Sequence, residues 1–159
     1  AKSEKEEHIA IKWFSYAIDT YDKKHPNYFK SYWLRGARHS KKKNWDDAIS
    51  DFTKVLELNP TGYARAYLYR GIMWTQKGNV RKRYPQALSD FKKLIDNPNS
   101  ELKPSQNTVA EAYYHRGTYK YLAGDKTGAC SDATKAGSIG LPQSMKTDAW
   151  KWLCEGISM

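Results

Sequence analysis

A block of residues recurs three times along this chain, and this internal repeat constrains the fold more than any other feature. Each copy has an Arg-Gly pair with a Tyr four residues before the Gly, and an Ala-x-Ser-Asp run or a close variant follows. The glycines are 35 and 46 residues apart. Such a period is typical of stacked helical hairpins. The anchor residues are Tyr32, Gly36, Ala48 and Asp51, then Tyr67, Gly71, Ala87 and Asp90, then Tyr113, Gly117, Ala129 and Asp132.

The residue types at the repeated positions describe a pair of antiparallel helices. Gly36 and Ala48 are small, so they fit where two helices approach closely, and aromatic residues fill the space beside them. Asn59-Pro60 ends the second helix, because the residue before a proline is disfavoured in helical conformation. One hairpin cannot cover its apolar face alone, so the sequence predicts hairpins that stack and share a core.

The aromatic, small and helix-ending residues of the first copy resemble the tetratricopeptide repeat, whose unit is about 34 residues. The resemblance covers about residues 29–142, and the Arg-Gly and Ser-Asp-Phe variants are similar to the prokaryotic form. The third copy has Ala133 where Phe is expected. The resemblance implies an all-α, right-handed solenoid of antiparallel helical hairpins, with about three and a half units and a C-terminal capping helix. The matching residues are Tyr32, Gly36, Trp45, Ala48, Phe52 and Pro60.

The resemblance also divides the chain into the units of a single domain, residues 1–159. The first unit is a half repeat, because Ala10, Phe14 and Ala17 have the spacing of a second helix. The middle repeat carries about four additional residues near Val80–Arg83, in the turn between its helices. The expected units are the half repeat at 1–27, repeats at 28–62, 63–100 and 108–142, and the capping helix at 143–159.

No constellation in the sequence points to catalysis. The four histidines have none of the spacings that bind a metal, and there is no GxSxG or phosphate-binding glycine motif. No apolar run approaches the roughly eighteen residues that a membrane-spanning helix needs. We therefore expect a protein that is not an enzyme, with no catalytic residue, metal, cofactor or small-molecule substrate, and with no transmembrane segment.

The resemblance implies a concave groove lined by the first helix of each hairpin. The residues expected there make a mixed aromatic and aliphatic trough, which suits an extended peptide or the apolar face of a helix. The alternative is that several of these rings only pack between neighbouring helices, and the sequence leaves both interpretations open. The expected groove residues are Trp33, Arg65, Leu68, Ile72, Thr75, Tyr114, Thr118 and Tyr121.

The arginine of each Arg-Gly pair recurs together with the aspartate of each Ser-Asp pair. A contact that stacks repeats needs the same residue in every copy, whereas a ligand site rarely does. The sequence therefore predicts ion pairs within or between units. The residues are Arg35, Arg70 and Arg116, and Asp51, Asp90 and Asp132.

Two basic clusters are expected to lie side by side on one edge. The net charge is +10, of which residues 29–62 contribute +3 and residues 63–100 contribute +6. Equivalent turns of successive repeats lie close together, because packed helices are about 8–10 Å apart. The edge is either a docking strip for an acidic protein, an anionic membrane or nucleic acid, or a set of solvated turn residues. Its residues are Lys41, Lys42, Lys43, Arg81, Lys82 and Arg83.

The two cysteines lie in helices that are expected to be antiparallel neighbours. Cys130 is near the start of one and Cys154 near the end of the other, which favours a disulfide if the Cα atoms are within about 7 Å. The Gly-Ala-Cys-Ser-Asp run also resembles the terminal segment of exported bacterial repeat proteins. Two buried free thiols are the alternative. A bridge implies an oxidising compartment such as a periplasm or lumen, and free thiols imply the cytoplasm.

These features predict a scaffold or adaptor that binds a peptide or helix of another protein in the groove and an acidic partner at the basic edge. The alternative is a helical repeat protein that binds nucleic acid through the basic edge and exposed rings. Against it, the first helices carry no recurring pairs of base-reading side chains. Nucleic acid is therefore the less favoured partner, and peripheral contact with a membrane stays open.

Overall fold

The computed structural model describes residues 2–78, 85–96, 101–141 and Cys154. Within these ranges the chain forms seven helices and no strand, so the prediction of an all-α fold is confirmed. The helices are α1 (Lys2–Thr20), α2 (Phe29–Lys41), α3 (Trp45–Leu58), α4 (Ala64–Lys77), α5 (Gln86–Ile95), α6 (Gln106–Leu122) and α7 (Lys126–Ile139).

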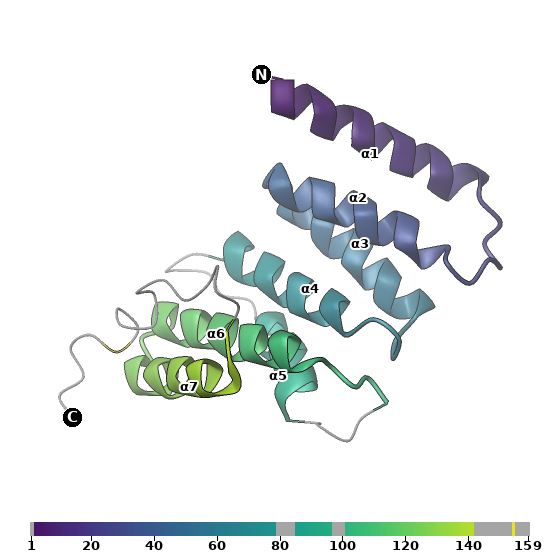
Figure 1. Ribbon diagram of the computed structural model, residues 1–159. Coiled ribbons are helices and arrows are strands. Elements are labelled where there is room, and N and C mark those ends of the chain that lie inside the picture. Colours follow the sequence, from purple (N-terminus) through teal and green to yellow (C-terminus); the bar gives the residue numbers. More distant parts are fainter. Residues whose placement is uncertain (1, 79–84, 97–100, 142–153, 155–159) are drawn as a thin grey trace.

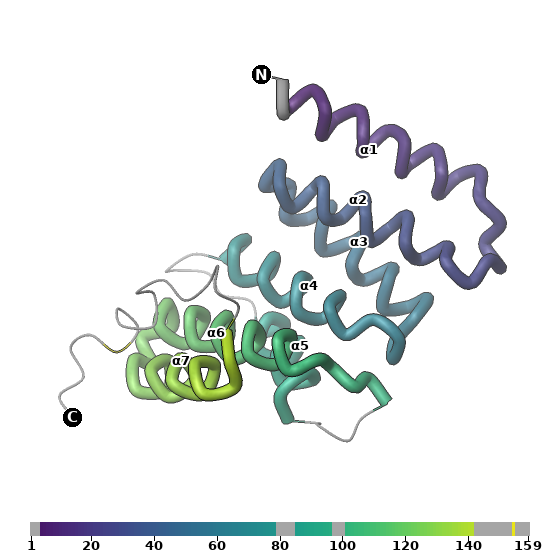
Figure 2. The backbone as a smooth tube through the Cα atoms, viewed as in Figure 1, coloured from purple at the N-terminus to yellow at the C-terminus, as the bar shows by residue number. Residues whose placement is uncertain are grey.

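The helices follow one another along the molecule in sequence order, from α1 at one end to α6 and α7 at the other (Figure 1, Figure 2). The closest pairs are α2 with α3, α4 with α5 and α6 with α7, and α3 also packs on α4 and α5 on α6. α1 packs on α2. The fold is therefore a helical repeat solenoid, in which each hairpin contacts only its neighbours.

A glycine in the first helix lets each hairpin close tightly. A Cβ atom at Gly36 would lie 3.1 Å from the ring of Phe52, and at Gly71 it would lie 2.7 Å from the ring of Phe91. The equivalent atom at Gly117 would be 3.0 Å from a backbone oxygen of α7. These separations are shorter than ordinary van der Waals contact, so the predicted role of the repeated glycines is confirmed.

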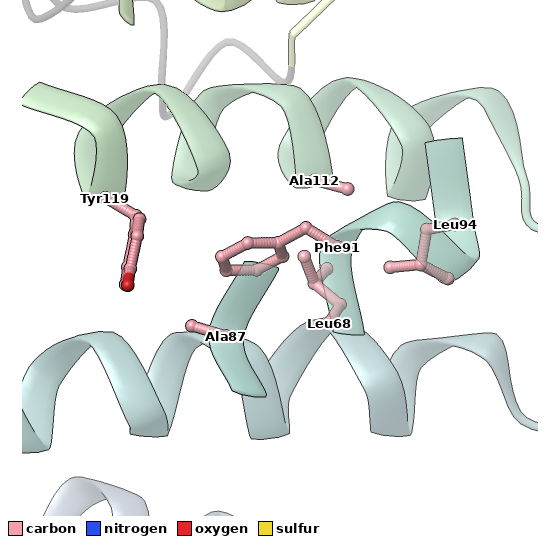
Figure 3. Close-up of a cluster of buried hydrophobic side chains, with 6 residues drawn as sticks. All are labelled: Leu68, Ala87, Phe91, Leu94, Ala112 and Tyr119. Atoms are coloured by element: carbon pink, nitrogen blue, oxygen red, sulfur yellow. The ribbon is translucent and has the colours of Figure 1, made fainter. Parts of the chain in front are cut away.

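Phe91 lies at the centre of a buried cluster that joins three helices (Figure 3). Leu68 comes from α4, Leu94 from α5 beside Phe91, and Ala112 from α6, and all four side chains are at most 1% exposed. Phe52 is likewise 0% exposed in the hairpin before. The core is thus a row of small clusters between helices, as expected for stacked hairpins.

The last hairpin has small residues where the other two have a buried Phe. Ala129 and Ala133 of α7 are at most 1% exposed. The rings of Tyr114 and Tyr121 from α6 pack against them. Large side chains on the first helix thus compensate for small ones on the second.

The ends of the helices follow local capping signals. Asn59 Oδ1 accepts a hydrogen bond from the Gly62 amide at 2.9 Å in the turn after α3. Ser105 caps α6, so this helix begins two residues before the predicted boundary at 108. The three hairpins span residues 29–58, 64–95 and 106–139. The predicted insertion near Val80–Arg83, and the predicted capping helix apart from Cys154, lie outside the described residues.

Candidate functional site

The repeated arginines and aspartates form the same ion pair in all three hairpins. In each one the guanidinium of the first helix donates from Nε and Nη2 to the carboxylate of the second helix, and the Nη2–Oδ1 distance is 2.7 Å. The aspartates are 3% exposed. Bidentate geometry fixes the orientation of the two helices, and the predicted ion pairs are confirmed. They are Arg35–Asp51, Arg70–Asp90 and Arg116–Asp132.

Each of these arginines also contacts the preceding hairpin or helix. The guanidinium lies over the Tyr ring of its own helix, 5.2–5.8 Å from the ring centroid. Its Nη1 atom points back to the preceding second helix. Three helices are thereby joined at every arginine, which is a structural role rather than a catalytic one. The backward contacts are Arg35–Ser15 and Arg70–Thr53 at 3.1 Å, and Arg116–Asp96 at 3.7 Å.

The charged groups of these pairs respond to burial and to each other. Burial raises the pKa of Asp90, and the hydrogen bond and charge of Arg70 oppose this effect. The hydrogen bond to Asp51 raises the pKa of Arg35, and the hydrogen bond to Asp132 does the same for Arg116. Removal of one partner would leave the charge of the other partly buried and without a counter-charge. Each pair therefore favours the arrangement in which the two helices of its hairpin bring both groups together.

Two of the expected groove residues are buried in α4. Leu68 is 0% exposed because α5 and α6 cover it. Thr75 is 9% exposed, and its hydroxyl donates to the Gly71 carbonyl oxygen at 3.0 Å. Neither side chain reaches the surface, so the candidate binding surface does not include them.

The aromatic residues expected in the groove have extensive contacts inside the protein. The Trp33 ring centroid lies 4.8–5.2 Å from the ring centroids of Phe52, Tyr63 and Tyr69. Tyr114 packs on the alanines of α7 and is half-buried, and its burial raises its pKa. Trp33 and Tyr114 thus make the contacts expected if the rings pack between neighbouring helices, which is the alternative to a binding groove.

His115 lies beside Tyr114 and packs against the core. Its imidazole is stacked on Phe91, with ring centroids 6.4 Å apart and planes at 17°. The rings of His115 and Tyr114 meet edge to face, with their centroids 5.2 Å apart. Burial lowers the pKa of His115 to about 4, so it is neutral at neutral pH and packs as an aromatic ring.

Two columns of accessible side chains remain on the first helices α4 and α6. Arg65 and Ile72 are seven residues apart and share one face of α4, as Glu111 and Thr118 do on α6. The Arg65 side chain is 54% exposed, and its Nη2 lies 3.9 Å from Oε1 of Glu111, which connects the two columns. Burial raises the pKa of Glu111, and the charge of Arg65 opposes this. Ile72, Thr118 and Tyr121 are half-buried.

One carboxylate of α1, Glu7, partly neutralises the basic edge. Lys41 Nζ is 3.4 Å from Glu7 of α1, and Arg38 contacts the same carboxylate at 3.3 Å. Lys42 and Lys43 are exposed in the turn after α2. The second predicted cluster, Arg81, Lys82 and Arg83, lies outside the described residues.

The two cysteines are joined as a disulfide. Cys130 is in α7, and its Cα atom is 4.7 Å from that of Cys154. The separation is within the range that a disulfide needs. The rest of the segment that carries Cys154 lies outside the described residues.

Among the described residues, no group of His, Cys, Asp and Glu side chains could hold a metal ion. None of the described helices is both long enough and apolar enough to cross a bilayer.

An exposed apolar face on α1 was not predicted from the sequence. Ile9, Trp13 and Tyr16 are 46%, 67% and 62% exposed. The signal was present, because Trp13 takes the position of Asp51 when Phe14 is aligned with Phe52. Only the structure shows that no described helix covers this side of α1.

Residues 29–61, which form α2, α3 and the turn after them, match the family model described as Tetratricopeptide repeat. No curated protein matches the chain significantly. No solved structure matches it significantly either. The matched segment contains a glycine contact and a bidentate ion pair that recur in the next two hairpins, and a buried Phe that recurs in the next hairpin only. The chain therefore contains a tetratricopeptide repeat at residues 29–61.

Proposed function

We propose that this chain is a non-catalytic scaffold that holds a segment of another protein across the exposed faces of α4 and α6. Tetratricopeptide repeats typically serve as scaffolds for protein–protein interaction, and they are typically not enzymes. The observation that carries the proposal is the pair of columns with Arg65 and Ile72 on α4 and Glu111 and Thr118 on α6. All four side chains lie on helices; Arg65 is 54% exposed, and Glu111 is 15% exposed. Ile72 and Thr118 are half-buried and present part of their surface to a partner.

The columns favour a partner that combines acidic and apolar side chains. Arg65 is half-exposed, and its 3.9 Å contact with Glu111 is too long for a close hydrogen bond, so guanidinium donors are available to a carboxylate. Ile72 lies two turns along the same face and offers apolar contact. An extended peptide or a helix with an acidic residue and an apolar residue about 10 Å apart would reach both, because seven helical residues rise about 10.5 Å.

The basic edge supports this choice of partner only in part. Lys41 and Arg38 already contact Glu7, so the lysines of the first turn offer less free charge than the sequence indicates. A net positive charge still increases the association rate of an acidic partner. Nucleic acid remains the less supported alternative.

Peptide selection with the intact protein tests the proposal. Binders from a displayed random 12-residue library should contain Asp or Glu together with apolar residues. Arg65→Glu should weaken the selected peptides by at least about tenfold. The matched control is Lys135→Glu, which makes the same charge change at an exposed position on α7; it should change affinity by less than about twofold. Equal losses in both variants would show that net charge, and not this surface, governs binding.

A further inference from the structure

One face of α1 exposes three large apolar side chains. Ile9, Trp13 and Tyr16 follow one another at spacings of four and three residues, so they lie on the same side of the helix. The rings of Trp13 and Tyr16 touch edge to face, with centroids 6.5 Å apart. Adjacent exposed apolar groups of this size mark a contact surface.

The internal repeat identifies which position α1 occupies. When Phe14 is aligned with Phe52, Ser15 falls on Thr53. Arg35 donates to Ser15 at 3.1 Å, and Arg70 donates to Thr53 at the same distance. α1 therefore packs on α2 as α3 packs on α4, and α1 is equivalent to the second helix of a hairpin.

The same alignment shows what covers such a helix. In α3, Ala48 and Phe52 are both 0% exposed, and Gly36 of α2 approaches the Phe52 ring. Their counterparts Ala10 and Phe14 are only partly buried, because α2 covers α1 from the other side. The position of Trp13 is one that α2 covers in the next hairpin, where Asp51 is 3% exposed. Ile9 and Tyr16 align with Asp47 and Lys54, which stay accessible at the rim of that contact.

We propose that an amphipathic helix of a partner protein completes this hairpin by packing antiparallel on Ala10, Trp13, Phe14 and Ala17. This contact continues the series of helix pairs α2–α3, α4–α5 and α6–α7. It lies on α1, away from the columns of α4 and α6, so it and the proposed function can fail separately.

The residues of α1 specify the chemistry of that helix. It carries a small residue opposite Phe14, as Gly36 lies opposite Phe52. It needs no arginine opposite Trp13, because the carboxylate that binds Arg35 in the next hairpin is absent at this position. Lys12 is exposed beside Trp13, so an acidic residue on the rim of the partner helix is favoured.

A second copy of the chain is a poorer occupant. Two α1 helices that packed antiparallel about Trp13 would bring the two Lys12 ammonium groups together. The first helices α2, α4 and α6 are already paired within their own hairpins. A bilayer is also disfavoured, because Glu6 lies seven residues before Trp13 on the same face and would meet anionic headgroups.

A peptide probe tests the proposal directly. A fluorescent peptide with the sequence of residues 28–42 and with Arg35→Leu and His39→Glu reproduces the helix that covers α3. The first change removes the charge that pairs with Asp51, and the second supplies the acidic rim residue at the position that faces Asp47 of α3. Titration of the intact protein should give saturable binding by fluorescence anisotropy. Trp13→Glu should weaken that binding at least tenfold, whereas Tyr21→Glu, at a 52% exposed residue beyond α1, should change it less than twofold. Hydrogen exchange should show added protection at residues 9–17 when the peptide is bound.

Several results would overturn the proposal. They are the absence of saturable binding, equal losses with both glutamate variants, and undiminished binding of a peptide that also has Gly36→Leu. Sedimentation showing a dimer that Trp13→Glu converts to a monomer would assign the face to a second copy. Trp13-dependent sedimentation with phosphatidylglycerol vesicles would assign it to a membrane. Circular dichroism of each variant confirms the fold, and Trp13 is exposed enough for its replacement to leave the helix intact.

Discussion

α1 and α3 hold the same position in the repeat and are covered differently. α3 is enclosed by α2 and α4, and it has Asp51 in a buried ion pair and Phe52 at 0% exposure. Among the described helices, α2 is the one that packs extensively on α1, and Trp13 stands at the position of Asp51 with 67% of its surface exposed. The difference shows that the residue type at a repeated position depends on which helix covers that position. A buried carboxylate such as Asp51 is stable only where a guanidinium forms an ion pair with it.

The largest expected difference between the two helices is the cost of removing their aromatic side chain. Phe52→Ala should reduce the free energy of unfolding by about 3–5 kcal/mol, because it leaves a cavity in a fully enclosed site. Phe14→Ala should cost about half as much or less, because Phe14 is only partly buried. Urea unfolding at pH 7 measures both. Equal costs would mean that α1 is as well covered as α3.

The ion pair gives the next largest effect. Asp51→Ala should cost about 2–3 kcal/mol, because Arg35 is left without its partner while still partly buried. Trp13→Asp, which places a carboxylate at the equivalent position of α1, should change stability by less than about 0.5 kcal/mol because the site is open to water. The double variant Arg35→Leu with Asp51→Leu should recover part of the loss. The account would be wrong if Trp13→Asp were as destabilising as Asp51→Ala.

The smallest of the three effects is a pH dependence of the free energy of unfolding, which arises from His115 in the enclosed part of the molecule. The pKa of His115 is about 4 when folded and 6.5 for an ordinary histidine, so the unfolded chain binds more protons between these values. This contribution to the free energy of unfolding is complete above about pH 6.5 and is lost as the pH falls towards 4. We expect a loss of about 2 kcal/mol, less than the full shift implies, because the His115 side chain is partly accessible to solvent.

Comparison of two histidine variants isolates this effect. His115→Asn should reduce the difference in unfolding free energy between pH 7 and pH 4.5. His8→Asn, at an exposed position of α1, should leave that difference close to the wild-type value. An unchanged difference in the His115 variant would show that the ring is accessible to protons in the folded state.

Much of the fold could be predicted because the repeat encodes it locally. Gly36, Ala48 and Phe52 describe a close helix pair by size alone, and the recurrence of Arg35 with Asp51 indicates a shared contact. The sequence favours a bridge between Cys130 and Cys154, and the structure joins these two residues as a disulfide. Each of these inferences depends on residues within one hairpin or on a short link.

The parts of the site that could not be predicted depend on contacts between hairpins. Leu68 and Thr75 have the register of groove residues, but the way α5 and α6 cover α4 buries them. Lys41 appears as a free cation in the sequence, and only the position of α1 brings Glu7 to it. The open face at Trp13 likewise follows from which helix is next to α1. Residue spacing along one helix does not contain this information.

Native-state hydrogen exchange on the unliganded protein tests the central claim most directly, that α1 is a second helix covered on one side only. Residues 9–17 of α1 should exchange at least about 100-fold faster than residues 48–56 of α3, because opening α1 separates it from α2 alone. Equal protection of the two segments would contradict the claim, since it would require a cover on the open side of α1 that none of the described helices provides.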